Sequence, residues 1–537
     1  MHFRLHPSPL GWILCSLAAV ASQILFSTAA MADAKDSKSD IVSIHTGRIQ
    51  GSVDAGVISF KGIPFAAPPV GNLRWRPPQP AAKWSGIRKA TEFGHDCMQL
   101  PSIFSNSPSE DCLYANVWAP EQHGPNLPVM VWIYGGAWVV GGSSLPAFDG
   151  SEFARKGIVF VSFNYRLGRF GYFGFPALTQ EGKNGLLGNY GYMDLIAALK
   201  WVQRNIAAFG GNPHQVTIIG QSAGGFAVHM LMTSPLAKGL FQRAMVESGG
   251  GGFMHNCTGL RAGMNGRLSA EQMGVNFAKS KGIDGVDDAA LEKLRALPPD
   301  AILDGLTATN IDAANSTYAG PMIDGKLVVG QPPVLYRQGK YQHVPMVLGA
   351  NNGDASVSRA TSEKELFASF GNNAKAAEKA YDAANSGSFP LLRNAVGADA
   401  LFVGPERFVA QTLSSQGDPV WEYRFSYVPD AARTMLPGAP HGGETPFVFD
   451  SKTWFIAGLK LTAEDEKMAR AMSTYWANFA KTGNPNGAGL PDWPSYAAST
   501  DMLMDFTENR PTAKTDPWKE RLDLTEELEA QDLKAEN

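Results

Sequence analysis

Continuous apolar runs and helical periodicity alternate along the first half of the chain. Residues 129–134 (VMVWIY) and 158–163 (IVFVSF) are apolar at nearly every position, which is typical of parallel strands buried on both faces of a sheet. Residues 190–209 carry apolar side chains at helical spacing, and a short strand predicted over 216–220 leads directly into a helix predicted over 223–233. Strands that alternate with helices predict an α/β fold with a mostly parallel central sheet flanked by helices.

The rest of the chain extends this sheet and adds insertions to it. Alternating apolar and polar residues at 43–65 predict short antiparallel strands, and the charged stretch from residue 514 onward is expected to be frayed. The remaining predicted elements are strands at 243–247, 344–348 and 421–427, two or three helices within 268–306, and an amphipathic helix at 464–482.

The first 32 residues differ in kind from the rest of the chain. A mostly apolar run from Leu10 to Phe26 precedes Ala30-Met31-Ala32, the small residues at which a signal peptidase cleaves. We interpret residues 1–32 as a cleaved signal peptide of a secreted or periplasmic protein and residues 33–537 as a single domain. The alternative is an uncleaved membrane anchor, but the run is short for a span and contains polar residues.

Composition excludes several classes of partner. Lys and Arg number 46 against 50 Asp and Glu, a formal net charge of −4, so neither nucleic acid nor an anionic membrane is expected as a partner, and stable membrane insertion is not expected. No His, Asp or Cys cluster has ligand spacing, so neither a metal nor an organic cofactor is expected. The expected partner is a small molecule, and the sequence leaves the oligomeric state open.

Export would place the cysteines in an oxidising compartment. Cys15 would leave with the signal peptide, so the mature chain keeps Cys97, Cys112 and Cys257. Cys97 and Cys112 would close a short loop rich in Ser, Pro and Asn, which makes them the plausible disulfide and leaves Cys257 unpaired. Three buried thiols are the alternative.

The most informative motif is Gly-Gln-Ser-Ala-Gly at residues 220–224. A short apolar strand precedes it and a helix-forming stretch follows, as in a nucleophile elbow. The sharp turn requires small residues two positions before and after the serine, and Gly220 and Gly224 meet that need. The turn lifts the Ser222 hydroxyl to the start of a helix, whose dipole favours developing negative charge.

Several motifs in order resemble the type-B carboxylesterase family, which includes cholinesterases. The resemblance runs from about residue 43 to about residue 506 and implies an α/β-hydrolase fold, with loop and helical insertions forming a cap over the cleft. One departure is Ala115, where the family usually has a larger aliphatic residue. The motifs are FKGIPFA at 60–66, EDCLYANV at 110–117, NYRLG at 164–168, GNYG at 188–191 and FGGNP at 209–213 followed by GQSAG at 220–224.

A serine hydroxyl needs a base, and α/β-hydrolases order the triad as Ser, acid, His. His229 lies within the helix that follows the elbow, and His255 and His343 precede the best acid candidate. His441 remains as the general base, in a Gly-rich loop, GAPHGGE at 438–444, that resembles the family's catalytic-histidine loop.

The orienting acid is expected at the carboxyl end of a strand. Asp354 lies in the loop after the strand predicted at 344–348 and matches the position at which the family usually has Glu. The shorter side chain keeps the charge that orients the imidazole. Asp324 and Glu444 are weaker candidates for the same role.

The resemblance also implies an oxyanion hole and a supporting serine. Its donors are the N–H groups of Gly136 and Ala137, in a Gly-rich loop after an apolar strand, and of Ala223 after the nucleophile. Ser248 resembles a family serine that supports the triad from behind. Gln221 stands where cholinesterases have Glu, so nothing points to a choline-type substrate.

The predicted activity is hydrolysis of a carboxylic ester through an acyl-enzyme. Two alternatives use the same fold: a non-catalytic adhesion protein, which would have lost triad residues, and a hydrolase of amides or carbamates. Four aromatic residues are expected either to line the cleft or to belong to the core: Phe104, Trp138, Phe226 and Phe253.

Overall fold

The structure of the protein is a computed structural model. It describes residues 40–535 except 103–104, 183–184, 254–257, 265, 312, 357, 383–386, 453 and 455–458. The predicted signal peptide at 1–32 and the residues Phe104, His255 and Cys257 therefore lie outside the described residues. No helix within the described ranges combines the length and the apolar character needed to cross a bilayer.

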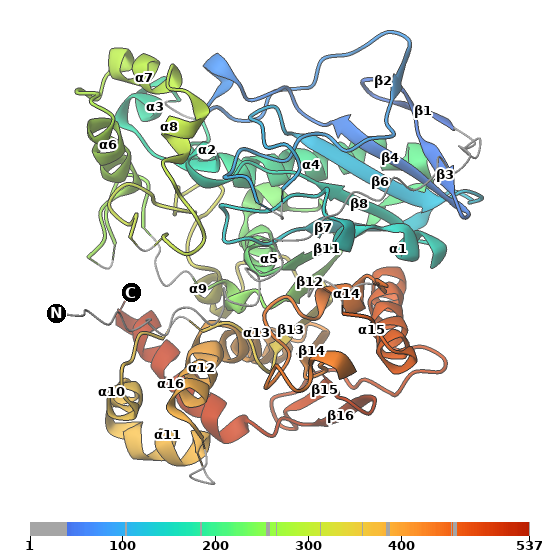
Figure 1. The fold of residues 1–537 in the computed structure, drawn as a ribbon, viewed down its shortest axis with the longest axis vertical. Helices are drawn as coiled ribbons and strands as arrows, with labels where there is room; N and C mark the ends of the chain where they lie inside the picture. Colours follow the sequence, from blue (N-terminus) through green and yellow to red (C-terminus); the bar gives the residue numbers. More distant parts are fainter. Residues whose placement is uncertain are drawn as a thin grey trace, which may run out of the picture.

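One large sheet runs through the centre of the molecule (Figure 1). Among the described residues it has eleven strands in the order β16-β15-β14-β13-β12-β11-β7-β8-β6-β4-β3. The pairings from β8 through β7, β11, β12, β13 and β14 to β15 are parallel, and those at both edges are antiparallel. The predicted mostly parallel sheet is confirmed. The strands are β3 (Ser52–Asp54), β4 (Val57–Pro64), β6 (Tyr114–Pro120), β7 (Leu127–Ile133), β8 (Val159–Phe163), β11 (Gly211–Gln221), β12 (Arg243–Glu247), β13 (Met346–Asn351), β14 (Val420–Phe425), β15 (Met502–Phe506) and β16 (Pro511–Thr515).

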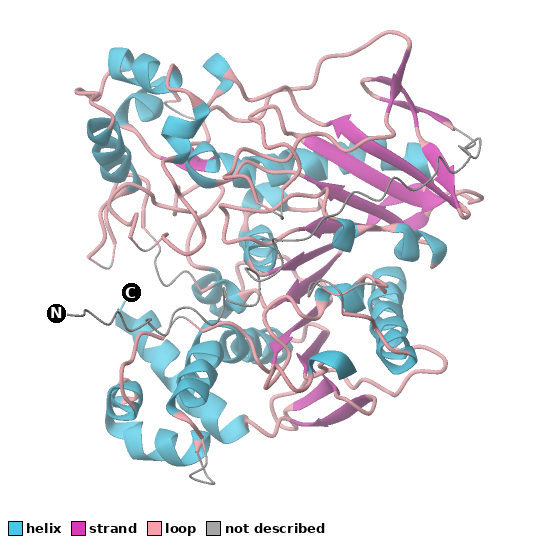
Figure 2. Cartoon of the chain, in the orientation of Figure 1, coloured by secondary structure: helices cyan, strands magenta, loops and turns pink. Residues whose placement is uncertain are grey.

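Helices cover both faces of the sheet (Figures 1 and 2). Helices α1 (Ser151–Arg155) and α15 (Ala463–Thr482) lie on one side, and α5 (Ala223–Thr233) and α13 (Gly404–Ser415) lie on the other. The central strands are buried on both faces, for example all five residues of β8. This burial explains why their sequences are apolar runs rather than alternating patterns.

Two helical insertions follow the carboxyl ends of neighbouring strands. After β12 the chain forms α6 (Ala270–Ser280), α7 (Asp288–Arg295) and α8 (Pro299–Leu303). After β13 it forms α10 (Glu363–Ala368), α11 (Ala374–Tyr381) and α12 (Phe389–Ala398). Both groups leave the sheet from the edge at which Ser222 lies, as expected for insertions that shape a cleft.

The prediction of a frayed chain from residue 514 onward is wrong. The chain pairs β16 with β15 and then forms α16 (Lys519–Ala535). Leu522 is fully buried, and the buried Arg407 of α13 forms ion pairs with Asp523 and Glu526 of α16. The charges that suggested a solvated tail therefore pair with buried groups, which a sequence pattern alone does not reveal.

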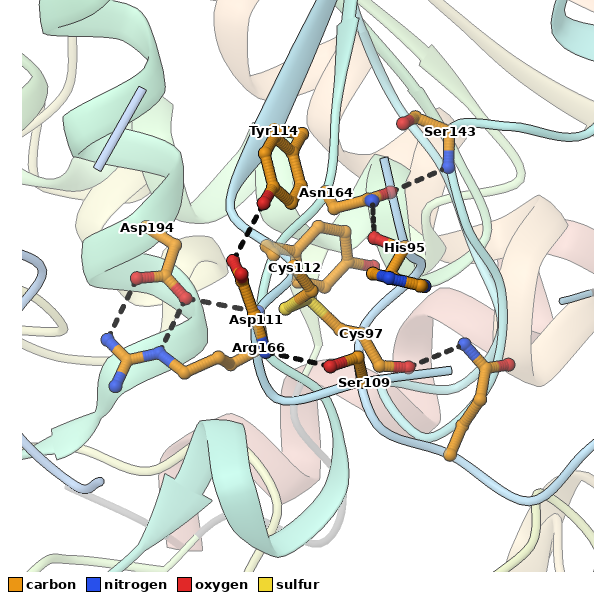
Figure 3. Close-up of a disulfide and its surroundings, with 12 residues drawn as sticks. His95, Cys97, Ser109, Asp111, Cys112, Tyr114, Ser143, Asn164, Arg166 and Asp194 are labelled. Carbon is orange, nitrogen blue, oxygen red and sulfur yellow. Dashed lines mark hydrogen bonds and ion pairs between the residues drawn. A yellow bond between two sulfur atoms is a disulfide. The ribbon is translucent and has the colours of Figure 1, made fainter. Parts of the chain in front are cut away.

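The predicted disulfide between Cys97 and Cys112 is confirmed (Figure 3). Both cysteines are almost completely buried. The bond closes the loop that leads into β6, beside the ion pair of Arg166 and Asp194.

Candidate active site

A tight turn between β11 and α5 presents Ser222. Strand β11 ends at Gln221 and α5 begins at Ala223, so Ser222 alone makes the turn, with φ 56° and ψ −126°. A Cβ atom on Gly220 would lie 2.3 Å from the carbonyl oxygen of Gly224. A Cβ atom on Gly224 would lie 2.0 Å from the carbonyl oxygen of Ile133 in the neighbouring strand β7. Both outer glycines of the motif are therefore required by close backbone contacts, as the predicted elbow demands.

The structure brings together the three predicted triad side chains. Nε2 of His441 lies 2.8 Å from Oγ of Ser222, and Nδ1 of His441 lies 2.5 Å from Oδ1 of Asp354. Ser222 and His441 are 219 residues apart in sequence, so the contact depends on the packing of distant loops. This is the geometry in which an imidazole can accept the serine proton while a carboxylate fixes its tautomer.

The loops that contain Asp354 and His441 are joined to each other by hydrogen bonds. The N–H of Gly353 donates to the carbonyl oxygen of Ala439 at 3.0 Å, and the N–H of Ala439 donates to Oδ1 of Asn352 at 2.7 Å. Asp354 follows the end of β13, so the sheet fixes the position of Asp354, and these bonds fix the loop that contains His441 against it.

The Asp354 carboxylate is buried and fully engaged. Its Oδ2 accepts a hydrogen bond from the Ser248 hydroxyl at 2.7 Å and from the N–H of Asn351 at 3.1 Å, and only 1% of the residue is exposed. Ser248 thus contacts the acid directly from the end of β12. These bonds to Oδ2 hold the carboxylate in place and leave Oδ1 to contact His441.

The two weaker acid candidates lie elsewhere. Asp324 accepts hydrogen bonds from Asn189 and from backbone N–H groups of its own turn, including that of Leu327. Glu444 is the last residue of the histidine loop and is fully buried, and its carboxylate accepts a bond from Asn351 rather than from His441. Burial and then the charge of Asp354 raise the pKa of Glu444 to about 7.

The environment of the His441 ring raises its pKa above the usual range. Burial lowers this pKa, but the charge and hydrogen bond of Asp354 and the charge of Glu444 together raise it by more. One face of the ring stacks on Phe402, with centroids 4.8 Å apart, and 28% of the His441 side chain is exposed. Sequence reasoning missed Phe402, which lies on a π-helical turn over Asp399–Val403 and has no recognisable sequence signal.

The predicted oxyanion loop lies directly against Ser222. A Cβ atom on Gly135 would lie 2.8 Å from Cβ of Ser222. The next residues have unusual backbone angles, with φ 114° at Gly136 and 52° at Ala137. The N–H groups of Gly136, Ala137 and Ala223 meet no acceptor among the described residues, so they are available for a negatively charged oxygen.

The other histidines that sequence reasoning set aside have structural surroundings. His229 is fully buried, with Nδ1 2.9 Å from the Tyr336 hydroxyl and Nε2 3.3 Å from Glu406. His343 is half-exposed and contacts Asp418. Neither contacts Ser222, in agreement with the choice of His441.

The aromatic residues considered for the cleft divide into two environments. Trp138 and Phe226 make an edge-to-face contact at 5.4 Å between the oxyanion loop and α5. Phe253 is buried and packs on Phe408 at 5.6 Å between ring centroids.

Gln221 lies near the site, with Nε2 3.4 Å from Nε2 of His441.

Comparison with known proteins identifies the class. The model of the carboxylesterase family matches residues 38–525, so the chain belongs to this family. It is a carboxylic ester hydrolase with the α/β-hydrolase fold, as the sequence motifs predicted.

Named relatives cover nearly the whole chain. The human cocaine esterase is 37% identical over 523 residues, which covers 88% of each chain. The fumonisin B1 esterase of Sphingopyxis macrogoltabida is 34% identical over 481 residues, or 85% of each chain. The solved structure of PNB esterase superimposes with a TM-score of 0.74 at 32% identity and covers 90% of this chain and 99% of its own.

Proposed function

We propose that the protein hydrolyses a carboxylic ester in two steps through an acyl-enzyme on Ser222. His441 accepts the serine proton as Oγ attacks the ester carbonyl, and then donates it to the leaving alcohol. Water attacks the acyl-enzyme with the same base and releases the acid. The observation that carries this proposal is the position of the His441 ring, which contacts Ser222 through one nitrogen and Asp354 through the other.

The groups around Ser222 and His441 have separate roles in this mechanism. The N–H groups of Gly136, Ala137 and Ala223 stabilise the tetrahedral oxyanion, helped by the N-terminus of α5. Asp354 orients the imidazole and stabilises its charged form. Ser248 positions Asp354 through the bond to Oδ2.

The proposal extends to the cell compartment and the chain organisation. The protein is exported by residues 1–32, and residues 33–537 act as a single hydrolase domain. The buried Cys97–Cys112 disulfide supports an oxidising compartment. The names of the relatives cover several kinds of ester. The proposal therefore names the bond that is hydrolysed and no particular acyl or alcohol group.

The choice of bond is tested with matched substrates. We expect p-nitrophenyl esters of short and medium acyl chains to be hydrolysed, and the matching p-nitroanilides to react at least about 10³-fold more slowly, because an amine leaves only when protonated. Release of p-nitrophenol or p-nitroaniline is followed by absorbance. Equal rates on anilides would assign the protein to amide chemistry, and no turnover of either set would favour the adhesion alternative.

The raised pKa of His441 predicts the acid side of the pH profile. Only the neutral imidazole accepts the serine proton, so kcat/KM falls as pH drops through this pKa. Because the pKa is raised, the fall begins at a higher pH than the value of about 6.5 for an unperturbed imidazole. Glu444 also raises the pKa of His441, but its own pKa of about 7 leaves it only partly ionised in this pH range. We therefore expect Glu444→Gln to move the acid limb to lower pH by less than the loss of the Asp354 charge would. An acid limb that moves to higher pH in Glu444→Gln would contradict the assignment of His441 as the base.

A further inference from the structure

The oxyanion loop holds an unfavourable backbone conformation. Ala137 and Trp138 are two successive residues with side chains at positive φ, 52° and 62°. Such residues persist only when surrounding contacts fix them. Gly168 supplies one contact, since its N–H donates to the carbonyl oxygen of Trp138 at 2.6 Å. The far end of the loop, at Gly141, needs another.

Gln99 supplies that contact with both ends of its side-chain amide. Its Oε1 accepts from the N–H of Gly141 at 2.9 Å, and its Nε2 donates to the carbonyl oxygen of Gly141 at 2.7 Å. The same Nε2 donates to the carbonyl oxygen of Cys97 at 2.9 Å. Only 1% of Gln99 is exposed, so water does not compete for these bonds.

The segment that precedes Gln99 in the chain is itself held in place by a disulfide and by hydrogen bonds. Cys97 is tied to Cys112 by the disulfide, and Asn164 bridges the two segments by accepting from the N–H of Ser143 at 2.8 Å and donating to the carbonyl oxygen of His95 at 2.9 Å (Figure 3). The disulfide segment thus forms a fixed support along one side of the oxyanion loop.

We propose that Gln99 is a positioning residue for the oxyanion hole, which transmits the constraint of the Cys97–Cys112 loop to the N–H groups of Gly136 and Ala137. The inference rests on the proposed function, because it assumes that these groups stabilise the oxyanion. Without the paired amide, Gly141 and the preceding turn relax, and the two donors move away from the transition-state oxygen. Displacement of such donors lowers the rate of the chemical step more than it weakens substrate binding.

The test replaces Gln99 by Met, which has similar length and no hydrogen-bonding amide. We expect Gln99→Met to lower kcat on a p-nitrophenyl ester by 10- to 100-fold, with KM changed less than threefold. Two inhibitors separate positioning from general damage. The Ser222 oxygen adds to the carbonyl carbon of an alkyl trifluoromethyl ketone, the carbonyl oxygen becomes a tetrahedral oxyanion, and the hydroxyl proton passes to His441. The Ki of this ketone is expected to rise in parallel with the loss of kcat. The corresponding secondary alcohol carries no oxyanion, and its Ki is expected to stay within threefold.

Asn205→Leu is the matched control. Asn205 is also a buried amide that braces the backbone, through the N–H of His45 and the carbonyl oxygen of Trp201. Neither of these bonds reaches the oxyanion loop, so kcat is expected to stay within twofold. A Gln99→Met enzyme with wild-type kcat and ketone affinity would overturn the inference, as would equal weakening of ketone and alcohol. If Gln99→Met does not fold, Gln99→Asn takes its place, because asparagine withdraws the amide by one methylene. The same comparison is then made between the change in the Ki of the ketone and the change in the Ki of the alcohol. Absence of ester hydrolysis in the wild type would instead defeat the proposed function.

Discussion

Replacing Ser222 by Ala is expected to lower kcat/KM on p-nitrophenyl esters by 10⁴-fold or more, to the level of assay background. The hydroxyl that lies 2.8 Å from Nε2 of His441 is the proposed nucleophile, and loss of a nucleophile in a serine hydrolase removes the covalent pathway entirely. Alanine has a Cβ, so the strain of the turn at φ 56° stays the same, and the protein should fold. The measurement is steady-state hydrolysis with protein purified to exclude host esterases.

Ser234→Ala is the control for this variant. Ser234 lies directly after α5, at the end opposite Ser222, and is buried. The same hydroxyl oxygen is removed at the opposite end of α5, and kcat/KM is expected to stay within twofold. Appreciable residual hydrolysis by Ser222→Ala, with the control unchanged, would place the nucleophile elsewhere.

Replacing Asp354 by Asn is expected to lower kcat by on the order of 10³- to 10⁴-fold with little change in KM. The asparagine keeps the shape but presents no charge to the imidazolium, and its amide can stabilise the wrong histidine tautomer. The hydrogen bond that Ser248 now donates to Oδ2 also loses a charged acceptor. Since the charge of Asp354 raises the pKa of His441, the remaining activity should show its acid limb at lower pH than the wild type.

Asp324→Asn tests whether any hydrogen-bonded, partly buried carboxylate would give the same result. Asp324 also accepts side-chain and backbone hydrogen bonds, but it does not contact His441. Its kcat should remain within a few-fold of wild type in protein that has a wild-type circular dichroism spectrum. If Asp324→Asn lost as much activity as Asp354→Asn, the assignment of the acid would fail.

The sequence predicted those parts of the site that depend on local geometry. Gly220 is required by its contact with Gly224, four residues further along the chain, and this spacing is visible in a five-residue motif. Parallel strands buried on both faces leave continuous apolar runs, and β7 and β8 lie where those runs predicted. Asp354 is predicted as the orienting acid because catalytic residues are expected at the carboxyl ends of such strands.

The missed features depend on contacts between segments far apart in the chain. Phe402 stacks on His441 through an irregular helical turn, and Gln99 reaches Gly141 across 42 residues. Neither contact has a periodicity or a fixed spacing. The C-terminal helix was mistaken for a solvated tail because its acidic residues pair with Arg407, a buried residue more than 100 positions away.

The most direct test of the account is to identify the residue that reacts with a fluorophosphonate, which phosphonylates an activated serine and expels fluoride. The modified protein is digested, and the labelled peptide is sequenced by mass spectrometry. We expect one phosphonyl group per chain, on Ser222, with activity lost in proportion to labelling and no label on Ser222→Ala. An enzyme that hydrolyses esters while Ser222 stays unmodified, or that reacts at another residue, would contradict this expectation.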